Sequence, residues 1–485
     1  MDMAATWTPA RTGSLAPSLI LLAAAVVAAN VQSFFIPIDG DVSWLITVSE
    51  QVLAGKRLYI DLFEVNPPAS VWLYVPMVWL AQLTGLRAEG VVAGTTILLA
   101  FLCSFATLRL ASRLRHSPPP IAFAATLGFV TLVLPGGLFA QREHVALLLA
   151  LPTLTVFALL AEQHPLSART RFVAGLAAGL VVVIKPHFAL AVGPAALWAA
   201  WQARSLRPLV PAIVAGALVL AAYAAGLLLF ARAYFDYLPL LAGTYLHMRE
   251  RWHLMLAGPS VFTPAALLGL AALLRPARVP PLATTLFLGT VGFALAAVIQ
   301  GKSYANHALP GTALGIAAFG VLLLKGGVTR ERQRLVGAAA LIMAAIPLSS
   351  THRILPQPGL AEALRRVAPP NPKMITLGTE LVTGHPAVRN VDGRWIGSRA
   401  SLFTVAGVQY RRPTKMSGAE RVQLERWYQA DIQSFADDVA RGRPDVVLVE
   451  VLEKRWIARE PLLVKAMRPY RYATRAGDIE IWLRR

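Results

Sequence analysis

The chain has 485 residues, of which 56% are hydrophobic and only 15% are charged, and its mean hydropathy is +0.55. A soluble protein of this size would carry about 25% charged residues, so the composition excludes an ordinary soluble enzyme and favours a polytopic α-helical membrane protein. The formal net charge of +20 does not indicate nucleic-acid binding. Much of it is arginine at the ends of apolar segments, where it sets topology, and the rest is spread through the C-terminal region.

Apolar runs of about twenty residues recur as far as residue 350, after which charged and proline-containing segments replace them. We therefore expect a transmembrane domain over 1–350 and a soluble domain over 351–485, which is a normal domain size. The first apolar run is longer than the roughly 7–15-residue core of a signal peptide, so we expect a retained anchor. The only cysteine, Cys103, lies in an apolar run and allows no disulfide within the chain.

Arginine clusters at the ends of the apolar runs predict the topology, because positive residues favour the cytoplasmic side. The clusters alternate correctly if residues 67–85 do not cross but form a helix at the outer interface. Residues 42–53 predict a second, shorter interfacial helix. The predicted spans are 15–36, 90–110, 120–140, 144–161, 171–185, 187–203, 208–231, 259–274, 280–300, 304–324 and 335–350. With about eleven crossings, the N-terminus is expected on the cytoplasmic side and the C-terminal domain on the outer, extracytoplasmic side.

This topology places most polar membrane-domain residues on the outer side, in a first loop over 37–89, a long loop over 231–258 and several span ends. These residues are Asp39, Asp41, Asp61, Glu64, Asn66, Arg142, Glu143, His144, Lys185, Lys302 and His307. Almost no ionisable residue remains at mid-membrane depth. A transporter or lipid flippase would place its ionisable residues there, often in repeated halves, and we find no internal repeat.

The C-terminal segment predicts a small α/β domain. Residues 373–379 and 444–450 have the pattern of short buried strands, and residues 420–442 have helical periodicity. Residues 470–485 predict a closing hairpin with a Gly-Asp turn. The domain contains no glycine-rich phosphate loop, so we expect it to have a supporting or acceptor-facing role.

Three elements follow one another in the first outer loop. They are Asp41 with Gly55 fourteen residues later, the stretch Tyr59-x-Asp61-x-x-Glu64, and Pro67-Pro68 before an apolar helix. This order resembles the polytopic glycosyltransferases of the GT-C superfamily, particularly the branch of the protein O-mannosyltransferases and the bacterial lipid A aminoarabinose transferases. Three later positions are similar to further elements of that branch: Glu143 in AQREHV, Lys185 in VVIKPH and His307 in KSYANHALP. Relatives often carry a lysine where this chain has Asn66.

The resemblance implies transfer of a sugar from a polyprenyl-phosphate donor, held at the membrane lipid, to a glycan, lipid or protein acceptor. A carboxylate would take the proton of the acceptor hydroxyl as it attacks C1, and one displacement inverts that carbon. Asp41 is the first candidate for this base, with Asp39 as its rival or partner. The alternative is that both acids only cap the helix that follows them.

The remaining candidates would bind substrate. They are Tyr59, Asp61, Glu64, Asn66, Arg142, Glu143, Lys185, Lys302 and His307. Arg142, Lys185 and Lys302 are the cations that could meet the lipid phosphate, which gains charge as it leaves. No residue is assigned to a metal, no cofactor is required, and participation of a divalent cation stays open. A zinc site built from Glu64, His247 and His253 lacks the usual ligand spacing.

Three other classes of function remain open. One is a transporter or flippase of lipid-linked glycans, and another is a non-catalytic scaffold that binds through its C-terminal domain. The third is a glycan polymerase or ligase, which would depend on outer-loop arginines more than on an acid of the first loop. The Asp-Gly-Asp at 39–41 also matches the metal-binding Asp-x-Asp of nucleotide-sugar transferases, but the nucleotide-binding domain those enzymes need is missing from this stretch.

Overall fold

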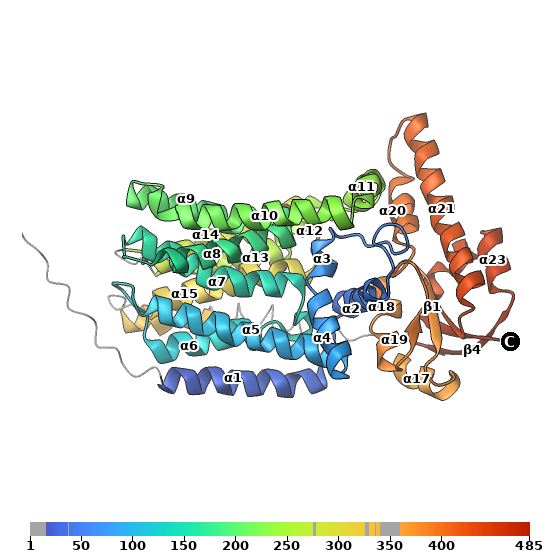
Figure 1. The fold of residues 1–485 in the computed structure, drawn as a ribbon, viewed down its shortest axis with the longest axis horizontal. Helices are drawn as coiled ribbons and strands as arrows, with labels where there is room; N and C mark the ends of the chain where they lie inside the picture. Colours follow the sequence, from blue (N-terminus) through green and yellow to red (C-terminus); the bar gives the residue numbers. More distant parts are fainter. Residues whose placement is uncertain (1–15, 37, 275–277, 325–328, 335, 340–358) are drawn as a thin grey trace, which may run out of the picture.

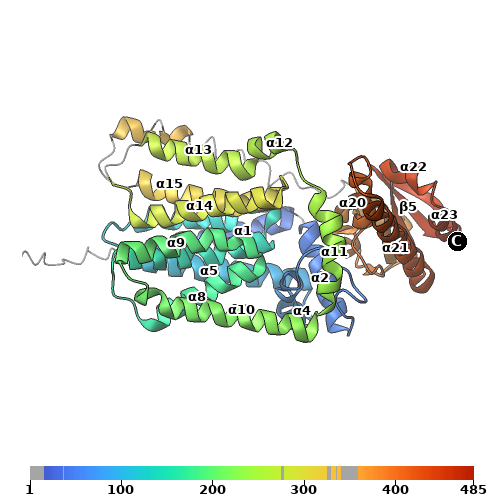
Figure 2. The ribbon, with the colours of Figure 1, turned by 90° about the horizontal axis from the view of Figure 1, so that it is seen from above.

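The computed structural model describes residues 16–36, 38–274, 278–324, 329–334, 336–339 and 359–485. Most of the predicted span 335–350, and the predicted domain boundary after residue 350, lie outside the described residues. Figures 1 and 2 show a bundle of long helices that run alongside one another, with the C-terminal region (359–485) at one end and short helices between the two.

The bundle contains nine helices of fifteen or more residues among those described. They are α1 (Ala16–Phe35), α5 (Ala88–Ala111), α7 (Arg142–Ala161), α8 (Ala168–Ile184), α9 (Ala189–Ala203), α10 (Val210–Phe230), α13 (Pro259–Leu273), α14 (Pro281–Gln300) and α15 (Ala305–Leu323). Five of the described helices are long and apolar enough to cross a membrane: α5, α7, α10 with the turn before it, α14 and α15. The helices coincide with the predicted spans to within a few residues, but the predicted count of about eleven crossings is not established.

The chain breaks within one predicted span and between two others, and both breaks have local causes. The span 120–140 ends early: α6 (Pro120–Gly128) passes into a π-helical turn (Phe129–Val133) and, after Pro135, a 3-10 turn (Gly136–Leu138). The predicted break between α8 and α9 lies at Lys185, whose backbone is extended with φ −149° and ψ 120°. The ring of Pro186 disfavours a helical conformation in the residue before it, so α8 must end there.

Helices α7 and α10 show the two environments of the bundle. Most of α7 is buried inside the protein, whereas α10 is apolar but exposed along nearly all its length. Helix α10 packs on α8 through small residues: a Cβ at Gly175 would come within 2.2 Å of the backbone of Ala212. Close backbone approach at small residues is a common way for helices to associate in a membrane.

The first loop contains three helices, α2 (Gly40–Leu53), α3 (Ala69–Trp72) and α4 (Val75–Thr84). The single helix predicted over 67–85 is therefore wrong in detail, because Pro76 has no N–H to donate to the carbonyl of Trp72. The helix predicted at 42–53 is confirmed as α2, and it is buried over most of its length beneath the C-terminal region. The predicted loop 231–258 is largely helical, with α11 (Ala233–Gly243), a 3-10 turn (Tyr245–His247) and α12 (Trp252–Ala257).

The C-terminal region forms a five-stranded sheet of order β2-β1-β3-β5-β4. The strands are β1 (Lys373–Leu377), β2 (Arg394–Trp395), β3 (Val446–Glu450), β4 (Tyr470–Ala476) and β5 (Ile479–Arg484). Strands β1, β2 and β3 are parallel, and β5 pairs antiparallel with β3 and β4. The helices of this region are α17 (Leu360–Val367), α18 (Leu381–Gly384), α19 (Ala387–Asn390), α20 (Phe403–Arg411), α21 (Gly418–Gly442), α22 (Lys454–Ile457) and α23 (Pro461–Met467). The two predicted strands, the helix and the hairpin are confirmed, while β2 and the helices of this region other than α21 were not predicted.

One apolar cluster joins the first loop to the sheet. It includes Val42 and Trp44 of α2, Ile375 of β1 and Val447 of β3. Arg389 of α19 adds ionic contacts to α2 and α5, with its NH2 2.8 Å from Glu50 Oε1 and its Nε 2.6 Å from Glu89 Oε1. The C-terminal region therefore holds α2, and with it the acids at the start of α2, against the bundle.

Candidate active site

The two acids of the first loop differ in their contacts. Asp39 is the N-cap of α2: its Oδ1 accepts hydrogen bonds from the backbone N–H groups of Asp41 at 2.7 Å and Val42 at 3.4 Å. Asp41 lies in the first turn and caps nothing, so the capping interpretation holds for Asp39 alone. The side-chain amide of Gln141 donates to both carboxylates, at 2.6 Å to Asp39 Oδ1 and 3.4 Å to Asp41 Oδ2. Burial beside Asp41 raises the pKa of Asp39 to about 8.

Arg142 is the cation nearest to these acids. Its NH2 lies 3.6 Å from Asp41 Oδ2, and its NH1 donates to Ser70 Oγ at 3.1 Å. The arginine side chain is only 3% exposed, whereas that of Asp41 is 35% exposed. Asp41 therefore keeps an open side on which a substrate can approach, with a fixed positive charge behind it.

A second, largely buried cluster surrounds Glu143, the next residue of α7. Lys185 Nζ donates to Glu143 Oε1 at 2.5 Å, to Gln300 Oε1 at 2.9 Å and to His307 Nε2 at 3.2 Å. Asn306 Nδ2 also donates to Glu143 Oε1, at 3.2 Å. Three candidates predicted from separate segments, Glu143, Lys185 and His307, are thus brought together by α7, α8 and α15.

Lys302 lies in the turn between α14 and α15 and is 4% exposed. Its Nζ donates to the backbone carbonyl of Tyr245 at 3.2 Å and lies 3.5 Å from the centre of that tyrosine ring. Among the residues that the structure describes, neither Lys302 nor its neighbour Arg249 forms an ion pair with a carboxylate. Burial, with Arg249 and Lys185 nearby, lowers the pKa of Lys302 to about 8.

The two sides of the site are connected. His307 lies 3.4 Å from the carbonyl of Lys302 through Nδ1 and contacts Lys185 through Nε2. Burial raises the pKa of Tyr245, whose ring lies against the ammonium of Lys302. Cations and carboxylates therefore form one continuous polar region around the start of α7.

The other first-loop candidates organise the loop itself. Glu64 is buried and accepts hydrogen bonds from Trp44 Nε1 and from both nitrogens of Asn66. Tyr59 donates to the carbonyl of Asn66 at 2.5 Å. Asp61 is 40% exposed and pairs with Arg57 at 3.2 Å, so the structure does not bring it to the acids of α2. Hydrogen bonds from Arg57 lower the pKa of Asp61.

Four buried polar atoms at the start of α7 and near it have no hydrogen-bond partner within the described part of the chain. They are Gln141 Oε1, Arg142 Nε, Glu143 Oε2 and Gln300 Nε2. A buried polar group without a partner is costly, by about 1–3 kcal/mol, so native proteins rarely leave several together without a ligand or water. Two of these atoms are donors and two are acceptors, which suits a ligand with both anionic and hydroxyl groups.

A metal cluster is not evident: the described residues contain no group of three or more His, Cys, Asp or Glu side chains that could hold an ion. Glu64, which one alternative placed in a zinc site, already has both carboxylate oxygens hydrogen-bonded. The structure therefore offers no specific set of ligands for a divalent cation among the residues it describes.

Sequence reasoning did not find several site residues. These are Gln141, Ser70, Tyr245, Arg249, Gln300 and Asn306. Gln141 and Asn306 each precede a predicted candidate, Arg142 and His307, so their position at a helix start was a usable signal. Arg249 and Tyr245 came from a segment predicted as loop, where nothing in the sequence shows which side chain turns toward Lys302.

No family model and no curated protein matches the chain. Among solved structures, 16 chains match. ArnT from Cupriavidus metallidurans in the apo state aligns with TM-score 0.52 at 14% identity, over 97% of this chain and 98% of that one. The Archaeoglobus fulgidus oligosaccharyltransferase AglB aligns with TM-score 0.47 at 13% identity, over 96% and 74%. The mycobacterial arabinofuranosyltransferase AftD gives TM-score 0.45 at 15% identity, over 98% and 42%. The chain is a multi-pass membrane protein with the fold of the GT-C glycosyltransferases.

Proposed function

We propose that this protein is an inverting glycosyltransferase that moves a sugar from a polyprenyl-phosphate donor to an acceptor hydroxyl. The observation that carries the proposal is the contact between Asp41, a partly open carboxylate, and a buried basic region that begins at Arg142. Such a site has a base for the acceptor and positive charge for a leaving phosphate. The GT-C fold supports glycosyl transfer as the class of reaction.

Asp41 is the proposed base. Its carboxylate takes the proton of the acceptor hydroxyl while the hydroxyl oxygen forms a bond to C1 of the sugar. The bond between C1 and the phosphate oxygen breaks, and the phosphate leaves with the electron pair. One such displacement inverts C1. Asp39 keeps the helix cap, and Gln141 holds the two acids in register.

Lys302 and Arg249 are the proposed partners of the leaving phosphate, with Arg142 completing the positive field. Lys185 is less suited to this role, because its ammonium already pairs with Glu143 at 2.5 Å. Lys302 has only a carbonyl and aromatic rings around its ammonium, so an anion gains more there. Preorganised charge of this kind is often the largest contribution to catalysis.

The proposed location follows from the arginine pattern. The site lies at the end of the bundle that carries the C-terminal region (Figure 1). Arg113, Arg115 and Arg204 lie near the opposite ends of α5 and α9. By the positive-inside rule the site then faces outward, with residues 1–350 as the membrane domain and 351–485 as a periplasmic domain of a bacterial-type inner membrane.

The test uses purified protein in liposomes with a panel of short-chain polyprenyl-phosphate sugars, and it measures release of polyprenyl phosphate. Asp41→Asn should fold normally but lose turnover by about 10²-fold or more, as expected when a general base is removed. Asp236→Asn is the matched control, because Asp236 also lies in the first turn of a helix, α11, and is exposed. The control should retain wild-type turnover.

Two results would contradict the proposal in different ways. Full turnover in Asp41→Asn would move the base to another residue. No cleavage of any donor by the wild-type protein, accompanied by movement of a lipid-linked glycan across the liposome membrane, would establish a flippase instead.

A further inference from the structure

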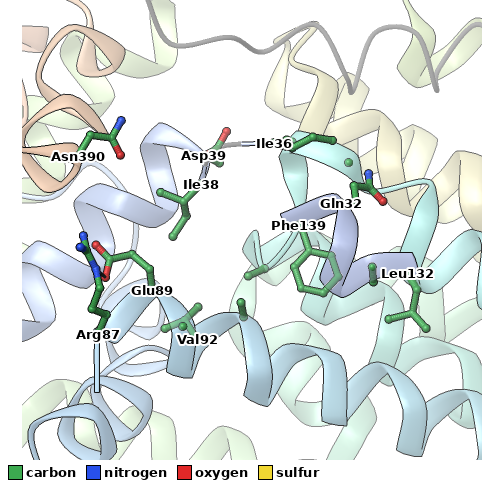
Figure 3. Close-up of a pocket in the computed structure, with 16 residues that line it drawn as sticks. Gln32, Ile36, Ile38, Asp39, Arg87, Glu89, Val92, Leu132, Phe139 and Asn390 are labelled. Atoms are coloured by element: carbon green, nitrogen blue, oxygen red, sulfur yellow. Dashed lines mark ion pairs between the residues drawn. The ribbon is translucent and has the colours of Figure 1, made fainter. Parts of the chain in front are cut away.

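A cavity of about 300 Å³ lies between α1, α5 and the turn at 136–140. Figure 3 shows that its lining has two characters. Val92, Leu132 and Phe139 line a mainly apolar part between the bundle helices, with the amide of Gln32 beside them, and a polar part is formed by Asp39, Arg87, Glu89 and Asn390. The cavity therefore extends from an apolar part in the bundle to one of the two first-loop acids.

An apolar groove of about 500 Å³ adjoins this cavity, and both are lined by Arg87 and Gly90. The groove follows α4 and α5 along Leu80, Val91 and Gly94. Helix α5 is long and apolar enough to cross a membrane, and an apolar groove along such a helix suits an acyl chain. A lipid could place its acyl chain in the apolar groove and its head group at the polar part of the cavity.

The cavity is distinct from the basic side of the site. Lys302, Arg249 and Arg142 are not among its lining residues, and the proposed donor phosphate needs those cations. Asp39 connects the two sides, because the amide of Gln141 that binds it at 2.6 Å also donates to Asp41. Of the two acids only Asp39 lines the cavity, so a hydroxyl that enters it meets Asp39, which the Gln141 amide links to Asp41.

We infer that this cavity binds the acceptor, and that the acceptor is a membrane lipid with a small, hydroxyl-bearing head group. The inference rests on the proposed function and narrows its acceptor from glycan, lipid or protein to lipid. The volume of the cavity is at the lower end of the range for small-molecule sites, which suits one head group better than a long glycan or a protein loop. Arg87 and Asn390 would contact the head group at the polar end, and Asp39 would orient its hydroxyl toward Asp41.

Gly90 allows a direct test. A Cβ at Gly90 would meet no described atom within 4 Å, so Gly90→Phe fills the cavity entrance without straining the helix. Gly269→Phe is the matched control, because Gly269 is exposed on α13 and its Cβ would likewise meet no described atom within 4 Å. Ala93→Phe, from another lining residue of the same cavity, provides a second variant if Gly90→Phe does not fold.

The probe is phosphatidylglycerol with a photoreactive group beside its glycerol hydroxyls, in phosphatidylcholine vesicles that contain the purified protein. We expect cross-links to the cavity lining near Ile38 and Phe139, reduced about tenfold or more in Gly90→Phe and unchanged in Gly269→Phe. Equal labelling of the wild type, Gly90→Phe and Gly269→Phe would mean that the probe reports only the surrounding bilayer. This result would overturn the inference.

A parallel measurement separates this inference from the proposed function. Donor cleavage is followed in the same vesicles, with mass spectrometry of the product. Both proposals are supported if the wild type attaches the sugar to a lipid, and if Gly90→Phe no longer forms this product while it still hydrolyses the donor slowly with water. Sugar on a peptide or soluble glycan, unaffected by Gly90→Phe, overturns the lipid acceptor and leaves the glycosyltransferase standing. Cross-linking without any donor cleavage leaves the lipid site standing and overturns the glycosyltransferase.

Discussion

Asp41 of the first loop and Glu143 of α7 occupy opposite environments, although they lie in one polar region. Asp41 is 35% exposed and its nearest cation is 3.6 Å away, whereas Glu143 is fully buried and only 2.5 Å from Lys185. A partly open carboxylate can exchange a proton with a substrate. A buried, paired carboxylate mainly fixes the positions of its partners, because separating such a pair is costly.

This contrast predicts that Glu143 affects stability where Asp41 affects the reaction. Glu143→Gln leaves the ammonium of Lys185 buried without an anion and should lower the free energy of unfolding by about 3–5 kcal/mol. Thermal unfolding in detergent, followed by loss of the monomer peak, measures the change. Asp41→Asn should leave the unfolding temperature close to that of the wild type.

The double variant Glu143→Gln/Lys185→Gln provides the control. Removing both charges should restore much of the lost stability, because no unpaired buried charge remains. If the single variant is as stable as the wild type, the pair does not hold the bundle together. Glu143 would then belong with Asp41 as a residue that acts on substrate.

The same contrast explains what sequence reasoning could reach. The resemblance to the GT-C glycosyltransferases named Asp41, Glu143, Lys185 and His307, through the order of the motifs along the chain. The pairing of Glu143 with Lys185 depends on how α7 packs against α8, which no local pattern encodes. Helix positions followed from hydropathy, but the breaks at Pro76 and Pro135 shortened two predicted elements.

The pH dependence of the reaction tests the proposed role of Lys302 in binding the donor phosphate. Its ammonium should lose its proton above about pH 8, so kcat/KM for the donor should fall on the alkaline side of that value. Lys302→Arg keeps the charge at every accessible pH and should remove this fall while changing the rate near pH 7 only a few-fold. Lys454→Arg, at a lysine that pairs with Glu480 in the C-terminal region, should leave the profile unchanged. An alkaline fall that persists in Lys302→Arg would assign it to another group.

Asp39 is a second group with a pKa of about 8, and its substitution should give the smallest effect. Its folded pKa of about 8 lies above the ordinary value of 3.8, so the protonated form stabilises the fold. This stabilisation is complete below about pH 4 and is lost as the pH rises through 8. Asp39→Asn mimics the protonated acid and can still cap α2, so turnover at pH 7 should fall by less than about fivefold.

We expect the unfolding temperature of the wild type to decrease between pH 4 and pH 8, and the variant should remove this decrease. An unchanged decrease would show that Asp39 does not bind the proton. A loss of turnover as large as that of Asp41→Asn would make Asp39 the base, and its carboxylate would then have to cap α2 and receive the acceptor proton at once. The two asparagine variants together thus decide which acid of the pair faces the reaction.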